Sequence, residues 1–154
     1  MEITAFDLAK KFVGMKEVAG EVDNPQIMAM LKLDASWPEH DEVPWCSALV
    51  NYICWLLRLP RSKSLRARSW LRIGVPIPAD QAVPGNDVVI LERGKGVQPG
   101  PEVIKAPGHV GFFAGYQILD NEETLVRILG GNQGNEVDID VYPVCRILGI
   151  RRLT

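Results

Sequence analysis

The sequence has few of the residues that cross-link proteins or bind metals. Its 154 residues include only three cysteines and two histidines. An odd and sparse cysteine count excludes a disulfide scaffold and is typical of a reducing compartment. Because His40 and His109 are the only imidazoles, a mechanism that needs one must use one of these two residues.

Long hydrophobic runs are also missing. The longest apolar stretch, residues 53–57, is far shorter than the ~20 residues that span a bilayer. The first residues show no basic segment followed by an apolar run, so the sequence predicts no secretory signal peptide. We therefore expect a protein made in the cytoplasm, without stable membrane insertion.

Neither sign of charge dominates the sequence. Seventeen basic residues stand against 19 acidic ones, giving a net charge of -2 that exerts no general attraction on nucleic acid. Residues 58–72 hold six basic residues and no acid, but their only aromatic residue is Trp70. We expect a solvated face or an attraction to the anionic cell wall or lipopolysaccharide, and no nucleic-acid partner.

Hydrophobic periodicity places helices before strands. An ordinary globular composition and this length indicate one domain, residues 1–154. Strands late in the chain favour an α+β fold, with N-terminal helices packed on a C-terminal antiparallel sheet. Helices are expected from Thr4 past Val13, from Asn24-Pro25 to Leu31, over 45–57 and over 64–72, and strands over 87–91, 109–114, 125–129, 137–142 and 146–151.

Cys46 has the most chemically informative position. It follows a proline-ended loop and falls in the first turn of the helix expected over 45–57. Free backbone N–H groups and the positive end of the helix dipole favour a thiolate there. A thiolate that cleaves an amide also needs a proton carrier, for which imidazole is the usual group.

His109 supplies the expected imidazole. It opens the strongest strand, directly behind the turn 106–108. The next strand ends in residues 130–133 (GGNQ), which a simple antiparallel meander would bring close to His109. Asn132 is therefore the expected third group, which orients the histidine ring.

These residues resemble a known family. A cysteine at a helix start, a Gly-His-Val strand and a polar residue on the next strand are similar to papain-like bacterial cell-wall hydrolases of the NlpC and CHAP groups, in a phage-associated branch. The resemblance covers nearly the whole chain. Its pieces are residues 14–17 with 24–25, 44–46, 67–70, 84–87, 108–111, 130–133 and 149–152.

The resemblance implies a papain-like fold and a cysteine mechanism. Cys46 would attack an amide carbonyl of a peptidoglycan stem peptide and form a thioester that water hydrolyses. His109 would protonate the leaving amine and then activate that water. Asn132 would hold the histidine tautomer, although relatives often have His or Glu there. The Cys46 backbone N–H would contribute to the oxyanion hole.

Other residues are expected to line the cleft or to be passive. His40, Asp41 and Glu42 lie just upstream of the nucleophile and are candidates for lining the cleft. The residues expected to contact substrate are Trp37, Trp45, Asp41 and Gln133. Cys54 and Cys145 are expected to be core or passive residues.

No metal and no other cofactor is expected. The cysteines and histidines lack metal-site spacing. Acidic residues alternate along one predicted strand and could attract calcium, although a solvated strand face is the favoured interpretation. They are Glu136, Asp138 and Asp140.

The expected function is therefore that of a monomeric phage endolysin without a separate wall-binding module. It would act on the cell wall after release through a holin. Two alternatives keep the same chemistry: a secreted antibacterial amidase with an immunity partner, and a virion-associated hydrolase. A third is a papain-like module that binds wall peptides without cutting them.

Overall fold

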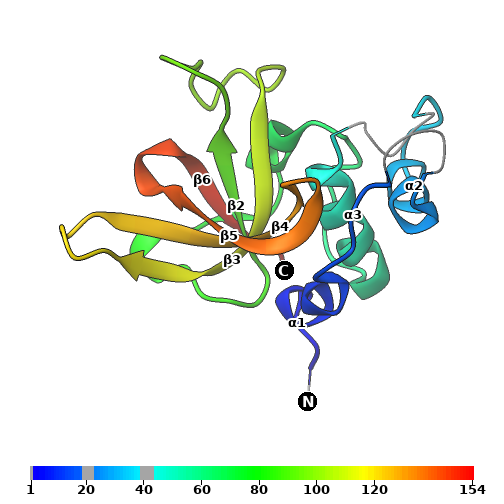
Figure 1. Ribbon diagram of the computed structural model, residues 1–154, viewed down its shortest axis with the longest axis horizontal. Coiled ribbons are helices and arrows are strands. Elements are labelled where there is room, and N and C mark those ends of the chain that lie inside the picture. Colours follow the sequence, from blue (N-terminus) through cyan, green and yellow to red (C-terminus); the bar gives the residue numbers. More distant parts are fainter. Residues whose placement is uncertain (1, 19–22, 39–43) are drawn as a thin grey trace.

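The structure is a computed structural model that describes residues 2–18, 23–38 and 44–154. Helices fill the first part of the chain and an antiparallel sheet the second, as the sequence predicts for the α+β class. The helices are α1 (Ala5–Ala9), continued by the 3-10 turn η1 (Lys10–Phe12), then α2 (Pro25–Leu31) and α3 (Cys46–Leu57). Figure 1 shows α1, α2 and α3 on one side of the molecule and the sheet on the other.

Local sequence signals explain where the helices begin. Thr4 accepts a hydrogen bond from the Asp7 N–H while the Asp7 side chain accepts from the Thr4 N–H, forming a capping box at α1. The Asn24 side chain accepts from the first N–H groups of α2, whose first residue is Pro25. The first helix tightens into η1 after Ala9 and ends before Gly14, whose φ is 97°.

The helix expected over 64–72 is shorter than predicted. It is a 3-10 helix, η2 (Ala67–Arg72). The Ser64 carbonyl, which would support an earlier helical turn, instead accepts from the Ser47 hydroxyl at 2.6 Å and from the Asn51 amide at 3.1 Å. The Ser64 hydroxyl accepts from the Arg66 N–H. Because the Ser64 carbonyl is engaged by two side chains of α3, the α-helix does not start at Ser64.

Among the described residues the sheet contains six strands, and neighbouring strands pair antiparallel. They are β1 (Val75–Pro76), β2 (Asp87–Glu92), β3 (Gly108–Ile118), β4 (Thr124–Gln133), β5 (Glu136–Pro143) and β6 (Ile147–Arg152). Short 3-10 turns precede β2 (η3, Ala79–Gln81) and β6 (η4, Val144–Arg146). The spatial order is β1-β6-β2-β3-β4-β5. Strands β2 to β5 thus form a meander, and β6 returns to pair with the other edge of β2.

Helix α3 is the element that joins the helical layer to the sheet. It contacts β3 and β4 on one side and α1 and α2 on the other. Leu49 and Ile53 of α3 share one buried cluster with Val110 and Phe112 of β3. A smaller cluster covers the opposite face of the sheet, with Phe113 among its members. Burial on both faces fixes the alternation of β3 and therefore the side on which His109 lies.

A close approach sets the distance between α3 and β4. A Cβ atom on Gly131 would lie 2.6 Å from the Trp45 ring and 3.3 Å from the Leu49 Cβ. Trp45 itself is fully buried, and its indole N–H donates to Glu17 at 2.8 Å. The absence of a side chain at Gly131 thus allows the start of α3 to lie directly on the end of β4.

Within residues 2–18, 23–38 and 44–154, no helix is long and apolar enough to cross a membrane.

Candidate active site

Cys46 and His109 meet where α3 packs against β3. Cys46 is the first residue of α3 and His109 the second residue of β3. Their side chains lie close enough for hydrogen-bonding and charge interactions that shift the pKa of each. Both are largely enclosed, with Cys46 3 % and His109 7 % exposed. The structure therefore places the two residues of the predicted catalytic pair in contact.

The environment of Cys46 favours a thiolate. Burial on its own raises the pKa of the thiol, but the hydrogen bond and the charge of His109 lower it, as do the backbone N–H groups of Val110 and Ser47. The balance lies below the ordinary thiol pKa. As the first helical residue, Cys46 also has a backbone N–H without an intrahelical partner, available for a developing oxyanion.

His109 shows the opposite shift. Burial lowers its pKa, yet the hydrogen bond and charge of Cys46 and the hydrogen bond that His109 donates to Gln133 raise it above the ordinary value. Its Nε2 lies 2.9 Å from Gln133 Oε1. Nδ1 is then the ring nitrogen left to face Cys46. The two shifts favour transfer of the thiol proton to the imidazole, which is what an activated cysteine requires.

Gln133 is held in the one amide orientation that serves this purpose. Its Nε2 donates to Asp138 Oδ1 at 2.7 Å and to the carbonyls of Asp138 at 3.0 Å and Ile128 at 3.2 Å. With three acceptors around the amide nitrogen, Oε1 must be the atom facing His109. That oxygen can only accept, so His109 carries its hydrogen on Nε2 and presents a free Nδ1 to the thiol.

Gln133 therefore occupies the position predicted for Asn132. No hydrogen bond joins Asn132 to His109 among the described residues; Asn132 only lines a hollow beside the ring. The cause is local: the register of β4 with β5 shifts between Gly130 and Gln133, and Asn132 takes a left-handed φ of 59°. The bulge changes which of the two residues faces the histidine.

Tyr142 is a site residue that the sequence did not reveal. Its hydroxyl lies 3.3 Å from His109 Nε2, and the two rings pack 5.3 Å apart. Burial raises the pKa of this phenol, and the nearby charges of Asp140 and Asp138 raise it further. Tyr142 thus remains a neutral group against the imidazole. A β5 tyrosine has no distinguishing motif, so only the strand pairing could have identified it.

A polar network fixes the first turns of α3. The Ser47 hydroxyl accepts from the Trp70 indole N–H at 2.9 Å and donates to the Ser64 carbonyl. Asn51 accepts from the Lys63 N–H and donates to groups of the same loop. The residue next to Cys46 is thereby tied to η2, which explains the contribution of the 67–70 motif to the site.

The structure buries two of the expected substrate contacts, exposes a third and does not describe the fourth. Trp45 is fully buried against Gly131, so its ring supports the fold and is not available to substrate. Gln133 is buried behind the histidine. Trp37 is 63 % exposed and lines a hollow that shares Arg66 with the larger hollow beside Cys46. Asp41, like His40 and Glu42, lies outside the described residues.

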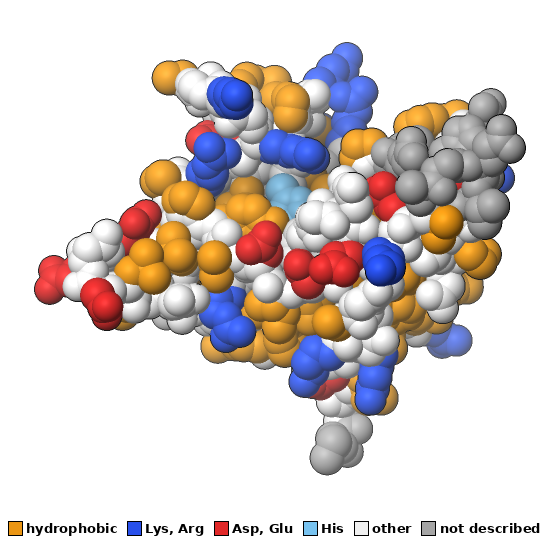
Figure 2. Space-filling view, in the orientation of Figure 1, with side chains coloured by type: hydrophobic (Ala, Val, Ile, Leu, Met, Phe, Trp, Pro, Cys, Tyr) orange, Lys and Arg blue, Asp and Glu red, His pale blue; other side chains and the backbone are white. Residues whose placement is uncertain are grey.

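Two hollows flank the cysteine–histidine pair. The larger, about 670 Å³, is lined by Cys46 and by Arg66, Arg93 and Lys105. The smaller, about 220 Å³, contains His109 and also reaches Arg93. In Figure 2 the histidine is visible between basic side chains on one side and acidic side chains on the other. Cys46 therefore borders the larger hollow and His109 the smaller one.

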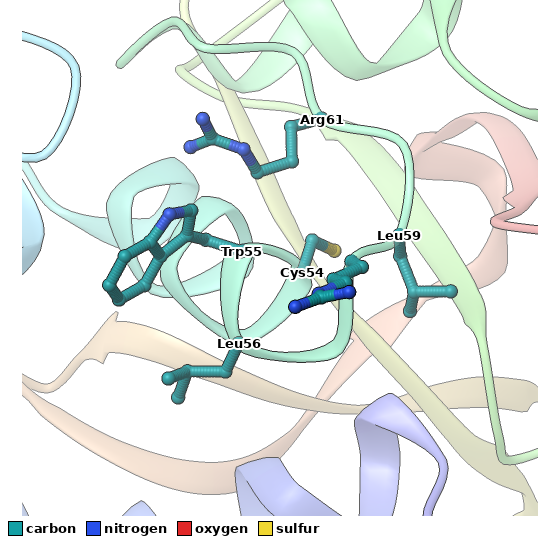
Figure 3. Close-up of a pocket in the computed structure, with 6 residues that line it drawn as sticks. Cys54, Trp55, Leu56, Leu59 and Arg61 are labelled. Atoms are coloured by element: carbon teal, nitrogen blue, oxygen red, sulfur yellow. The ribbon is translucent and has the colours of Figure 1, made fainter.

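The far end of α3 carries a hollow of different character. It has a volume of about 480 Å³ and is lined by Cys54, Trp55, Leu56 and two arginines among others. Figure 3 shows Trp55 and Leu56 projecting from the helix, with the Arg61 side chain on the side of Trp55 and away from Leu56. Burial raises the pKa of Cys54 to about 12, so this thiol stays protonated. It contrasts with Cys46 and is consistent with the passive role predicted for Cys54.

The remaining candidate residues are not assembled into a second centre. Cys145 is exposed in η4, and so does not belong to the core. The Asp138 side chain accepts from Gln133, and that of Asp140 accepts from the Val141 N–H. Across the part of the chain that the structure describes, no group of three His, Cys, Asp or Glu side chains is placed to hold a metal ion.

Comparisons with protein-family models, with curated proteins and with solved structures find no match for this chain.

Proposed function

We propose that this protein is a papain-like cysteine hydrolase of the NlpC/CHAP type that cleaves amide bonds in peptidoglycan stem peptides. One observation carries the proposal: a buried thiol at a helix start interacts with a histidine whose Nε2 meets a locked amide oxygen. Neither a structural cysteine nor a solvated histidine needs this chain of contacts.

The contacts support a two-step reaction. The Cys46 thiolate attacks the amide carbonyl, and the Cys46 N–H stabilises the resulting oxyanion. The imidazolium of His109 gives its Nδ1 proton to the leaving amine, which departs and leaves a thioester. His109 then takes a proton from water, whose oxygen attacks the thioester and releases the acid and the thiol.

Gln133 affects these reaction steps only through His109. Its oxygen accepts the Nε2–H throughout, which keeps Nδ1 directed at the reacting groups. A neutral amide stabilises the imidazolium less than a carboxylate would. Burial of the pair compensates in part, because the thiolate–imidazolium attraction is stronger where water is excluded.

Peptidoglycan enters the proposal through the motif resemblance. The motif pieces surround the candidate site: the 44–46 piece contains Cys46, the 108–111 piece contains His109 and the 130–133 piece contains Gln133. The open hollows on both sides of the pair suit an extended peptide better than a small enclosed ligand. A phage lysis enzyme that acts on the cell wall is the setting we propose.

Purified sacculi test the proposal directly. Wild type should release soluble fragments with new amino and carboxyl ends at a stem-peptide amide, identified by mass spectrometry. Cys46→Ala should release none, and Cys54→Ala, which removes the buried passive thiol, should retain the activity if it folds. Equal release by wild type and Cys46→Ala would refute the cysteine mechanism. Binding without release by wild type would favour the non-catalytic wall-binding alternative.

A further inference from the structure

The larger hollow beside Cys46 has a wall of one charge sign. Its charged lining residues are Arg66, Arg93 and Lys105, and no acid is among its lining residues. We call these three residues the basic wall. They come from three segments: the loop before η2, the residue after β2, and the loop before β3. All three residues are exposed to solvent.

The members of the basic wall form no ion pairs within residues 2–18, 23–38 and 44–154. Arg66 instead donates to the Lys105 carbonyl at 3.5 Å. Glu92 and Asp140 line the smaller hollow together with Arg93. The larger hollow itself has no acid in its lining, so the like charges that meet there favour the binding of an anion.

A buried arginine preorganises the loop that carries Lys105. Arg68 is fully buried, and it donates to the carbonyls of Pro107 at 2.9 Å, Pro99 at 2.9 Å and Gly100 at 2.7 Å. This cage fixes the loop on both sides of Lys105. A loop backbone that is already ordered loses less conformational entropy when a ligand binds.

The extent of the wall argues for a short anionic group. Figure 2 shows acidic side chains on the other side of the histidine, where a long polyanion crossing the site would be repelled. Guanidinium groups bind carboxylates through paired hydrogen bonds. Stem peptides contain free carboxylates close to their amide bonds, notably the glutamyl carboxylate left free by linkage through the side chain.

We infer that the basic wall is a subsite for a free carboxylate next to the scissile amide, so that the preferred substrates are stem peptides whose carboxylates are not amidated. The inference rests on the proposed function and deepens it. Arg66 and Lys105 bind the carboxylate from one side and Arg93 from the side nearer His109. Their contact holds the adjacent carbonyl within reach of Cys46.

The test compares cross-linked muropeptide dimers with the same dimers after their carboxylates are converted to carboxamides by ammonia and a carbodiimide. Wild type should cleave the free acid with a kcat/KM at least about tenfold higher, equivalent to one charge-assisted contact. Arg66→Gln/Lys105→Gln should lose most of that preference. Arg72→Gln/Lys95→Gln changes the net charge equally outside the hollow and should keep it.

The outcomes separate this inference from the proposed function. Equal cleavage of both forms by wild type would overturn the subsite while leaving the hydrolase intact. Equal loss of preference in both double variants would also overturn it, because general charge would then suffice. If wild type cleaves neither form, the hydrolase fails, and binding of both forms to Cys46→Ala decides the subsite. Tighter binding of the free acid supports it, and equal or absent binding overturns it.

Discussion

A buried thiol resists ionisation, so the charge state of Cys46 depends on what surrounds it. Burial raises its pKa, and His109 together with two backbone N–H groups brings the pKa below the ordinary value. The histidine in turn depends on Gln133, whose amide orientation is fixed by acceptors on β4 and β5. The nucleophile is therefore the end of a chain of contacts, each of which can be altered singly.

Gln133 and Asn132 provide the sharpest comparison at this scale. Gln133→Ala removes the acceptor of the His109 Nε2–H and frees the ring to rotate, so kcat/KM should fall by up to about 100-fold. Asn132→Gly keeps the left-handed backbone and should stay within about twofold of wild type. Steady-state cleavage of muropeptides measures both. A larger loss in Asn132→Gly than in Gln133→Ala would restore the assignment made from sequence.

The sequence predicts that Cys46 and His109 lie together, but it does not predict which residue accepts the hydrogen bond from His109 Nε2. Cys46 and His109 are marked by a helix start and a strand start, which leave local signals. Choosing between Asn132 and Gln133 depends on a strand bulge between Gly130 and Gln133, which changes the side on which a residue lies. The residue types at positions 130–133 do not indicate that register shift.

At the scale of elements, the contact of α3 with β4 determines the distance between the nucleophile and its support. The Trp45 ring lies where a side chain on Gly131 would be, and Leu49 packs beside it. Trp45 immediately precedes Cys46, and Gly131 lies two residues before Gln133. Displacement of either element would separate the thiol from the histidine that β4 holds in orientation.

Gly131→Ala tests that spacing. The added Cβ would lie 2.6 Å from the Trp45 ring, so α3 or β4 must shift. Overpacking of this kind costs about 1–3 kcal/mol of unfolding free energy. We expect a lower midpoint in urea denaturation and a loss of kcat/KM that persists after correction for the folded fraction. Unchanged activity of the folded variant would show that the spacing does not control the site.

Arg68 makes a second element-scale prediction. Arg68→Met leaves the carbonyls of the loop 99–107 without their donor, while relieving one buried guanidinium nitrogen that lacks a partner. We expect the free energy of unfolding to fall by about 1–3 kcal/mol. Amide hydrogen exchange should become faster in the loop and at the start of β3. Arg72→Met, on the exposed side of η2, is the matched control. Equal exchange in both variants would contradict the role given to Arg68.

For the whole molecule, the order of helices and strands is readable from periodicity, but the sheet order is not. Strands β2 to β5 follow the expected meander. Strand β6 instead pairs with the edge of β2 that faces away from β3, and the short β1 pairs with the outer edge of β6. That return depends on long-range pairing, such as Arg152 with the buried Asp87 at 2.8 Å. Single-sequence patterns contain no information on which edge a last strand selects.

The coupled pair also links folding to pH. Cys46→Ala removes the thiol whose hydrogen bond and charge raise the pKa of His109 and leaves burial, which lowers it. In this variant the folded state should resist protonation of the histidine, so that stability is lost as pH falls through the ordinary histidine pKa. Relative to Cys46→Ala/His109→Ala, which has no imidazole at this position, the stability of Cys46→Ala should therefore decline as pH falls from about 8 to 5. Urea denaturation of both variants across this range measures the difference, and parallel curves would contradict the effect of burial on His109.

The central claim is that Cys46 and His109 form one activated nucleophile, and the pH dependence of Cys46 alkylation tests it most directly. Iodoacetamide labelling, followed by peptide mass spectrometry, reports the thiolate fraction at each pH. In wild type the midpoint for Cys46 should lie below the ordinary thiol pKa. In His109→Ala it should rise above that value, since burial then dominates. The same midpoint in both proteins, or a wild-type midpoint at or above the ordinary value, would contradict the account.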